Sequence, residues 1–145
     1  MRSTKQIGFT LIELLVVVAI IAALTAIGIP AFNGYISSTK AKEAQNTLQT
    51  IFLMQKNYNA NNYCYYITPG TGDFSQNINQ YLMLSANPAA GPIKVGTENK
   101  YYFYITGTAS TSCTGSQADD YVAYAVSRAD GTVFSINQQS VKTGF

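Results

Sequence analysis

The first part of the chain is an almost unbroken apolar run. After a short polar start, residues 9–30 are apolar at nearly every position, and the only charged side chain among them is Glu13. As an α-helix this run would be about 33 Å long, at roughly 1.5 Å per residue, and the hydrocarbon core of a bilayer is about 30 Å thick. The run therefore predicts a helix that spans a membrane.

Glu13 stands out because a carboxylate inside a membrane span is costly, which marks it as a candidate functional residue. It lies near the start of the run, where the positive end of the helix dipole favours an anion. It still needs a partner once water is excluded, since one unpaired buried charge costs several kcal/mol. The alternative is an acid that reaches the membrane interface and has no partner.

Two helix-weakening residues, Gly28 and Pro30, lie at the end of the apolar run. Proline lacks a backbone donor and clashes with the preceding turn, and glycine has low helix propensity. We therefore expect the helix to kink or loosen at Gly28 and Pro30.

From residue 31 to residue 62 the pattern becomes amphipathic, because apolar residues recur at steps of three, four or seven. The recurring set is Ala41, Ala44, Leu48, Ile51 and Tyr58. This spacing predicts a second half of the same helix with one buried stripe. The asparagine-rich segment 57–62 indicates where the helix ends.

The remainder, residues 63–145, predicts a folded head domain. Residues 63–99 form a long connection with several Pro and Gly turn signals, and Asp130-Gly131 is a strong hairpin signal. Runs rich in aromatic and β-branched residues predict three strands, at residues 101–106, 121–126 and 132–136. We expect an antiparallel meander that covers the apolar stripe of the helix, which is an α+β fold. The tail, residues 138–145, is either a fourth strand or a surface cover.

The start of the chain resembles the N-terminus of a type IV prepilin. The matching residues are Lys5, then Gly8-Phe9-Thr10-Leu11-Ile12-Glu13, then the apolar tail. The resemblance implies a pilin fold, in which a long kinked N-terminal helix packs on a C-terminal antiparallel sheet. It implies four segments: a leader at residues 1–8, a membrane or filament-core half at residues 9–30, an amphipathic half at residues 31–62 and the head at residues 63–145.

The same resemblance implies a maturation and assembly route. A prepilin peptidase would cut between Gly8 and Phe9 and methylate the new amine of Phe9, and Glu13 would pair with that amine in a neighbouring subunit. The implied product is a homo-oligomeric helical filament, built by a pilus assembly machinery. The precursor would span the bacterial inner membrane once, and the subunit would end in an extracellular pilus that supports adhesion, motility or DNA uptake.

An exported chain also favours a disulfide between its two cysteines, Cys64 and Cys113. Closing a loop of about 50 residues would contribute about 3–4 kcal/mol in the chain-entropy model. The alternative is two unrelated small hydrophobic side chains.

The amino-acid composition argues against several other functions. The chain has no histidine, which removes Ser-His and Cys-His nucleophiles and most zinc sites, so we expect neither an enzyme nor a bound cofactor. Removing Arg2 and Lys5 with the leader leaves seven of the nine bases, equal to the seven acids. A balanced charge argues against a nucleic-acid binder, which usually carries a basic stripe.

Several alternatives stay open at this point. A minor pilin or a type II secretion pseudopilin would share the leader and the helix, and pseudopilin heads often bind calcium through loop acids such as the adjacent pair Asp119 and Asp120. DNA uptake would use bases; the candidates are Lys94, Lys100, Arg128 and Lys142. A third possibility is a single-span anchored binding module, a monomer that keeps residues 1–8.

Overall fold

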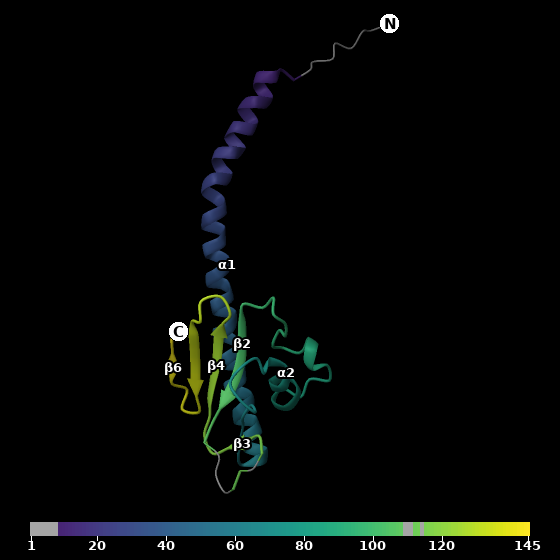
Figure 1. Ribbon diagram of the computed structural model, residues 1–145, viewed down its shortest axis with the longest axis vertical. Coiled ribbons are helices and arrows are strands. Elements are labelled where there is room, and N and C mark those ends of the chain that lie inside the picture. The colour runs from purple at the N-terminus through teal and green to yellow at the C-terminus, as the bar shows by residue number, and fades with distance from the viewer. Residues whose placement is uncertain (1–8, 109–111, 114) are drawn as a thin grey trace. The chain divides into compact units, whose positions relative to one another are not determined.

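The computed structural model describes residues 9–108, 112, 113 and 115–145 (Figure 1). The leader, residues 1–8, and with it the predicted cleavage residue Gly8, lies outside the described residues. The chain divides into two compact units, Met1–Thr39 and Lys40–Phe145. The long helix α1, Leu11–Asn62, contributes residues to both units.

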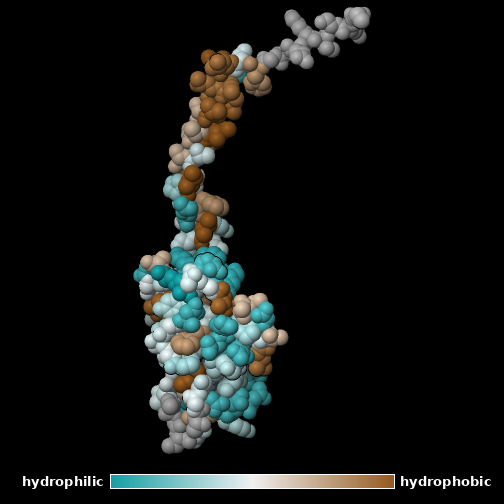
Figure 2. Space-filling model, turned by 45° about the vertical axis from the view of Figure 1, so that its right-hand side comes forward, coloured by the Kyte–Doolittle hydropathy of each residue, from teal (hydrophilic) through white to brown (hydrophobic). Residues whose placement is uncertain are grey.

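The described part of the first unit is the N-terminal portion of α1. Its large apolar side chains are exposed all round the helix; Leu11, Leu15, Ile20 and Ile27 are examples. Figure 2 shows these apolar residues as a brown surface along the helix. Within the described residues, α1 is the helix that is long and apolar enough to cross a membrane.

The second unit, which we call the folded unit, contains an antiparallel sheet of four strands in the order β2, β4, β5, β6. The strand bounds are Tyr101–Thr106, Val122–Ser127, Val133–Asn137 and Lys142–Thr143. The predicted meander is confirmed, although β4 and β5 each begin and end one residue later than the pattern indicated. The tail supplies the fourth strand, β6, which pairs with β5.

The core of the folded unit lies between the sheet and α1. Alternate residues of β2, β4 and β5 are buried, as a sheet with one covered face requires. The buried face of α1 carries Ala44, Leu48 and Ile51, which belong to the same apolar cluster as the buried strand residues. Ala44, Leu48 and Ile51 of the predicted apolar stripe are therefore buried in the core of the folded unit, as expected. The helix α1 ends at Asn62, in the asparagine-rich segment.

The connection between α1 and the sheet holds short elements. A two-stranded ladder joins β1, Tyr65–Tyr66, to β3, Gln117–Ala118. Between them in sequence come α2, Ser75–Asn77, the π-helical turn η1, Ile78–Leu82, and the 3₁₀ turn η2, Pro88–Ala90. The fold is α+β, as predicted, with a long N-terminal helix followed by antiparallel sheets.

Two buried amide side chains fix this connection. Gln55 donates from Nε2 to the carbonyl of Tyr66 at 2.6 Å and accepts from the Tyr66 N–H at 3.0 Å. Asn79 binds the backbone of Ile93 in the same way: its Oδ1 accepts from the Ile93 N–H at 3.0 Å, and its Nδ2 donates to the Ile93 carbonyl at 2.7 Å. Each amide satisfies backbone groups that no regular ladder reaches, which is why a segment with little secondary structure stays buried.

Candidate assembly site at the start of the apolar helix

The helix α1 begins with a reciprocal cap between Thr10 and Glu13. The Thr10 N–H and Oγ1 donate to Glu13 Oε2 at 2.9 and 2.7 Å, and the Glu13 N–H donates back to Thr10 Oγ1 at 3.4 Å. This is a capping box, in which two residues three apart satisfy the free donors of a helix start. Thr10 was not among the predicted site residues, although the Thr-x-x-Glu spacing that signals this cap is present in the sequence.

The cap orients the Glu13 carboxylate and uses one of its oxygens. Both Thr10 bonds reach Oε2, and no described group donates to Oε1. The carboxylate opens into a shallow hollow of about 370 Å³ lined by Phe9, Ile12, Val16 and Val17. A single acid among apolar walls attracts a cation strongly once water is displaced, because the local dielectric is then low.

The hollow therefore suits one small cation that arrives together with an apolar surface. A carboxylate and an ammonium that meet away from water also need good geometry and further hydrogen bonds. Thr10 already supplies hydrogen bonds to one oxygen of Glu13, which leaves the other oxygen for the incoming cation. Phe9, the first described residue, lies in the wall of the same hollow.

The helix α1 has no break at the position of the predicted kink. The helix α1 is continuous across Gly28 and Pro30, and a Cβ added at Gly28 would meet nothing within 4 Å. The loosening of the helix at Gly28 and Pro30 therefore stays a prediction.

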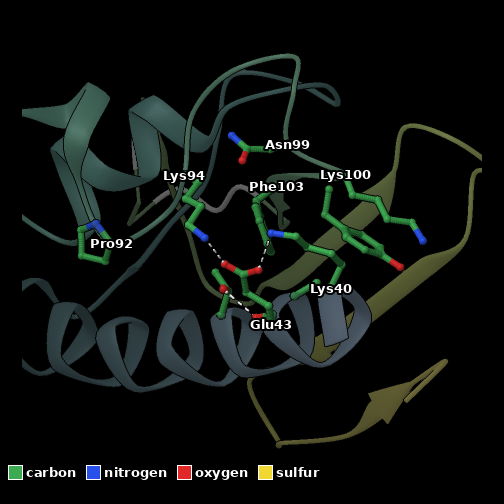
Figure 3. A pocket seen from close by; sticks show the side chains of 10 residues that line it. Lys40, Glu43, Pro92, Lys94, Asn99, Lys100 and Phe103 are labelled. Atoms are coloured by element: carbon green, nitrogen blue, oxygen red, sulfur yellow. Dashed lines mark hydrogen bonds and ion pairs between the residues drawn. The ribbon is translucent and has the colours of Figure 1, made fainter. Parts of the chain in front are cut away.

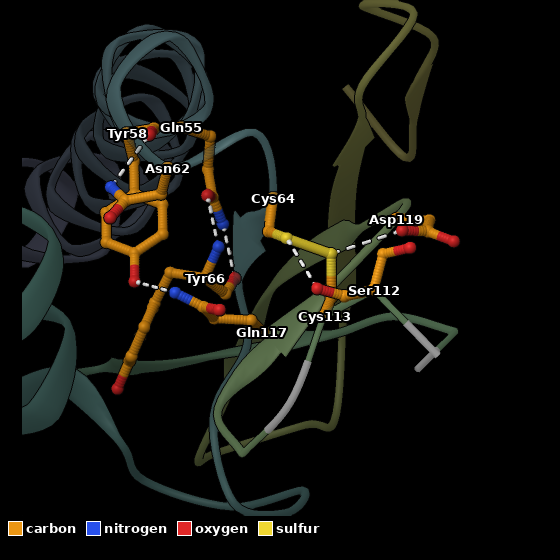
Figure 4. Close-up of a disulfide and its surroundings, with 9 residues drawn as sticks. All are labelled: Gln55, Tyr58, Asn62, Cys64, Tyr66, Ser112, Cys113, Gln117 and Asp119. Carbon is orange, nitrogen blue, oxygen red and sulfur yellow. Dashed lines mark hydrogen bonds between the residues drawn. A yellow bond between two sulfur atoms is a disulfide. The ribbon is translucent and has the colours of Figure 1, made fainter. Parts of the chain in front are cut away.

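The two cysteines are joined: Cys64 Sγ and Cys113 Sγ are 2.01 Å apart, and both residues are buried (Figure 4). Cys64 comes directly before β1 and Cys113 shortly before β3, so the bond ties together the two segments that form this small ladder.

A second charged site lies in the folded unit, in a hollow whose lining includes Glu43 and Lys100, and Lys40 and Lys94 point toward Glu43 (Figure 3). Glu43 pairs with Lys94 at 2.6 Å and with Lys40 at 3.1 Å. The hydrogen bonds from Lys94 and Lys40 lower the pKa of Glu43. The acid thus neutralises part of the positive charge, and the hollow holds only about 40 Å³ of free space.

Three of the four bases considered for DNA lie near one another, because Lys94 and Lys100 line one hollow and the Arg128 N–H donates to the Lys100 carbonyl at 2.8 Å. Arg128 pairs with Asp73, and Lys142 lies over the Phe145 ring at 5.3 Å. Lys94 is engaged by Glu43, although its hollow also includes Lys100. The acids considered for calcium each have a different contact, since Asp120 accepts from the Thr108 N–H at 2.6 Å and Asp119 Oδ1 lies 3.2 Å from Cys113 Sγ.

Comparison with known proteins bears on the N-terminal segment. Residues 3–29 match the family model of the prokaryotic N-terminal methylation motif. The chain is 47% identical over 51 residues to the type IV major pilin protein PilA of Myxococcus xanthus, and 60% identical over 43 residues to the type IV major fimbrial protein FimA of Dichelobacter nodosus. It is 69% identical over 32 residues to the prepilin peptidase-dependent protein D of Escherichia coli.

These alignments cover limited parts of each protein. They include 35%, 30% and 22% of this chain, and 23%, 26% and 22% of the respective relatives. The matched part of the chain thus spans about a quarter of the length of the relatives it matches. No solved structure gives a significant match. The resemblance to type IV pilins is confirmed, and the sequence matches that confirm it lie in the N-terminal third of the chain.

Proposed function

We propose that this chain is a structural subunit of a type IV pilus. It would be made as a single-span precursor in the bacterial inner membrane, cut between Gly8 and Phe9, methylated on the Phe9 amine and assembled into an extracellular helical filament. The observation that carries the proposal is Glu13, a carboxylate whose Oε1 accepts no bond from the described residues, in an apolar hollow beside Phe9 and within a segment that matches the methylation motif.

The proposed assembly step exchanges one apolar environment for another. Side chains such as Leu15 and Ile20 are exposed in the single chain and would be covered by lipid in the precursor. In a bundle of identical helices they would be covered by neighbouring subunits, so van der Waals packing replaces lipid contacts at modest net cost. Repeating one heterologous contact without closure gives a filament.

Glu13 would set the register of that contact. Cleavage leaves a cationic amine on Phe9, and Glu13 Oε1 of a neighbour would accept its hydrogen bond inside the apolar bundle. A misplaced subunit would leave both charges unpaired, at a cost of several kcal/mol. One register is therefore favoured over every other along the bundle.

The test replaces Glu13 in the producing cell and measures sheared filaments. We expect Glu13→Ala to lower filament yield at least about tenfold, which corresponds to about 1.4 kcal/mol per subunit contact. Glu13→Gln keeps the shape and removes the charge, and should fall to a similar level. Glu43→Ala is the matched control, since Glu43 is on the same helix but lies in the folded unit. Wild-type yield and subunit spacing in Glu13→Ala filaments would contradict the pairing.

The same preparation of sheared filaments distinguishes the proposed function from the alternatives. Mass spectrometry of the main filament protein should give a chain that begins at Phe9 with one added methyl group. An anchored binding module would be monomeric and would retain residues 1–8. A minor pilin or pseudopilin would be cleaved in the same way but would be scarce in the sheared fraction.

A further inference from the structure

The folded unit contains an aromatic hollow that the filament proposal does not use. It encloses about 430 Å³ and is lined by Tyr58, Tyr66, Tyr81, Ser116 and Gln117. Small-molecule sites typically enclose about 300–1,000 Å³ and combine aromatic walls with a few polar groups. We call these five residues the tyrosine hollow.

The tyrosine hollow is built from segments that are held rigidly. Tyr66 and Gln117 are direct partners in the β1–β3 ladder. The buried Gln55 holds both backbone groups of Tyr66, and the Cys64–Cys113 bond crosslinks the segments beside the two strands (Figure 4). A site fixed in this way loses little entropy when a ligand binds.

The three rings provide faces at different angles. Tyr66 forms the floor and is 3% exposed, while Tyr81 is 50% exposed. The Tyr66 and Tyr81 rings are stacked with centroids 6.0 Å apart, and the Tyr58 ring meets Tyr66 edge-on at 6.1 Å. Tyr81 is therefore the most exposed of the three rings and the one that a flat apolar surface of a ligand can reach.

The polar groups of the hollow are uncharged. Gln117 Nε2 donates to Tyr58 Oη at 3.0 Å, which leaves its Oε1 as an acceptor. The hydroxyls of Tyr66 and Tyr81 have no hydrogen-bond partner among the described residues. Burial, and then the neighbouring Tyr81 and Tyr58, raise the pKa of Tyr66 to about 12, so this phenol stays neutral and can donate.

These features select the class of ligand. A charged ligand would find no counter-charge, because none of the described residues that line the hollow is ionised at neutral pH. A purely apolar partner would leave hydroxyls and an amide oxygen without hydrogen bonds, at about 1–3 kcal/mol for each buried group. A neutral sugar ring fits both constraints, since it has a C–H face for the tyrosine ring and hydroxyls for the polar rim.

We propose that the tyrosine hollow binds one or two rings of a neutral saccharide, with a sugar face on Tyr81 and its hydroxyls on Gln117 and the tyrosine hydroxyls. This activity is independent of filament formation, because it uses only side chains of the folded unit. Failure of the sugar test would leave the filament proposal standing, and the reverse is also true.

The experiment uses the full chain in phospholipid nanodiscs free of glycoside detergents. The probes are fluorescein-labelled lactose, maltose, cellobiose and chitobiose, and the readout is fluorescence anisotropy. We expect at least one probe to bind with a Kd of about 1 mM or tighter. Tyr81→Ala and Gln117→Ala should each weaken that binding at least about tenfold, which is about 1.4 kcal/mol. Tyr63→Ala is the matched control, because Tyr63 is 89% exposed and does not line the hollow.

Three results would overturn the proposal. The first is a Kd above about 10 mM for every probe, and the second is wild-type affinity in both hollow variants. The third is self-association of the chain that Tyr81→Ala abolishes while no sugar binds, which would assign the tyrosine hollow to a second copy. Tighter binding of labelled 3′-sialyllactose than of lactose would overturn the choice of a neutral ligand.

Discussion

The two units of the chain differ in where their apolar surface finds cover. In the first unit Leu11 is 82% exposed and Ile27 is 76% exposed, whereas Leu48 and Ile51 in the folded unit are fully buried. The folded unit covers its core with its own helix and sheet. The described part of the first unit has apolar side chains exposed on every side of its helix. The match to the N-terminal methylation motif, residues 3–29, includes much of this uncovered segment.

The folded unit also covers one edge of its sheet, the edge formed by β2. Thr68 donates its N–H to the Ile105 carbonyl at 2.9 Å, and its hydroxyl accepts from the Ile105 N–H at 3.1 Å. Ser75 Oγ accepts from the Phe103 N–H at 3.3 Å. An edge strand covered in this way does not pair with other chains. We therefore do not expect the β2 edge of the sheet to pair with another chain.

The largest expected effect comes from a substitution that acts on the first unit alone. Gly8→Val should block cleavage, because a branched side chain at the cut position prevents the close backbone approach that glycine allows. We expect the whole chain to stay eight residues longer and filaments to be absent, as measured by mass spectrometry and electron microscopy. Glu98→Gln is the control, since Glu98 is an exposed residue of the folded unit. A chain that begins at Phe9 in Gly8→Val would show that the cut does not depend on this glycine.

The next largest effect comes from removing the disulfide, which acts on the folded unit alone. Removing the bond between Cys64 and Cys113, which are 49 residues apart, should lower the free energy of unfolding by about 4 kcal/mol. Urea unfolding of the double variant Cys64→Ala/Cys113→Ala, followed by near-ultraviolet circular dichroism of the tyrosines, measures this change. Membrane insertion should be unaffected. Reductant should destabilise the wild-type chain and leave the double variant unchanged; equal sensitivity of the two proteins would refute the role of the bond.

A smaller effect tests the buried amide beneath the tyrosine hollow. Gln55→Ala leaves the N–H and the carbonyl of Tyr66 without partners, and we expect a loss of roughly 2–5 kcal/mol in unfolding free energy. Gln49→Ala is the matched control, because Gln49 is an exposed residue of the same helix, and such changes usually stay within about 0.5 kcal/mol. Equal urea midpoints for the two variants would mean that water replaces the Gln55 amide.

Sequence patterns predicted the parts of this fold that have strong periodicity. Tyr101–Thr106 alternates buried and half-buried side chains as a strand pattern requires, and Gly131 adopts the positive φ of 70° that the Asp-Gly turn needs. The two-residue strands β1 and β3 were not predicted, because such short runs carry no period. Their pairing is supported by Gln55 of α1 and by the Cys64–Cys113 bond, which joins positions 49 residues apart, and no local pattern signals either contact.

The candidate site was predicted from chemistry more than from periodicity. Glu13 is conspicuous because a charge in an apolar run is costly. The Thr10 cap could also have been predicted, since Thr-x-x-Glu before an apolar run is a known signal for the start of a helix. The tyrosine hollow could not be predicted from the sequence, because its residues come from four separate places between Tyr58 and Gln117 that only the fold brings together.

The smallest expected effect concerns the ion pairs at Glu43, at the start of the folded unit. Its side chain is 42% exposed, so its pairs with Lys94 and Lys40 should contribute only about 0.2–1 kcal/mol after solvent screening. The Lys94 hydrogen bond, and then that of Lys40, lower the pKa of Glu43 below its ordinary 4.5. The native state therefore holds the ionised form more strongly than the unfolded state does. This contribution is present above pH 4.5 and is lost as the pH falls through the lowered native value.

Glu43→Gln should remove that dependence, and urea midpoints measured between pH 3 and pH 7 provide the test. The difference between wild type and Glu43→Gln should shrink as the pH falls below 4.5, and it should also shrink in high salt. Glu98→Gln is the control, since Glu98 is exposed and makes no ion pair within the described part of the chain. A pH-independent difference would mean that Glu43 acts through packing in its hollow. The hollow would then belong with the apolar core of the folded unit, and charge would matter to this protein chiefly at Glu13.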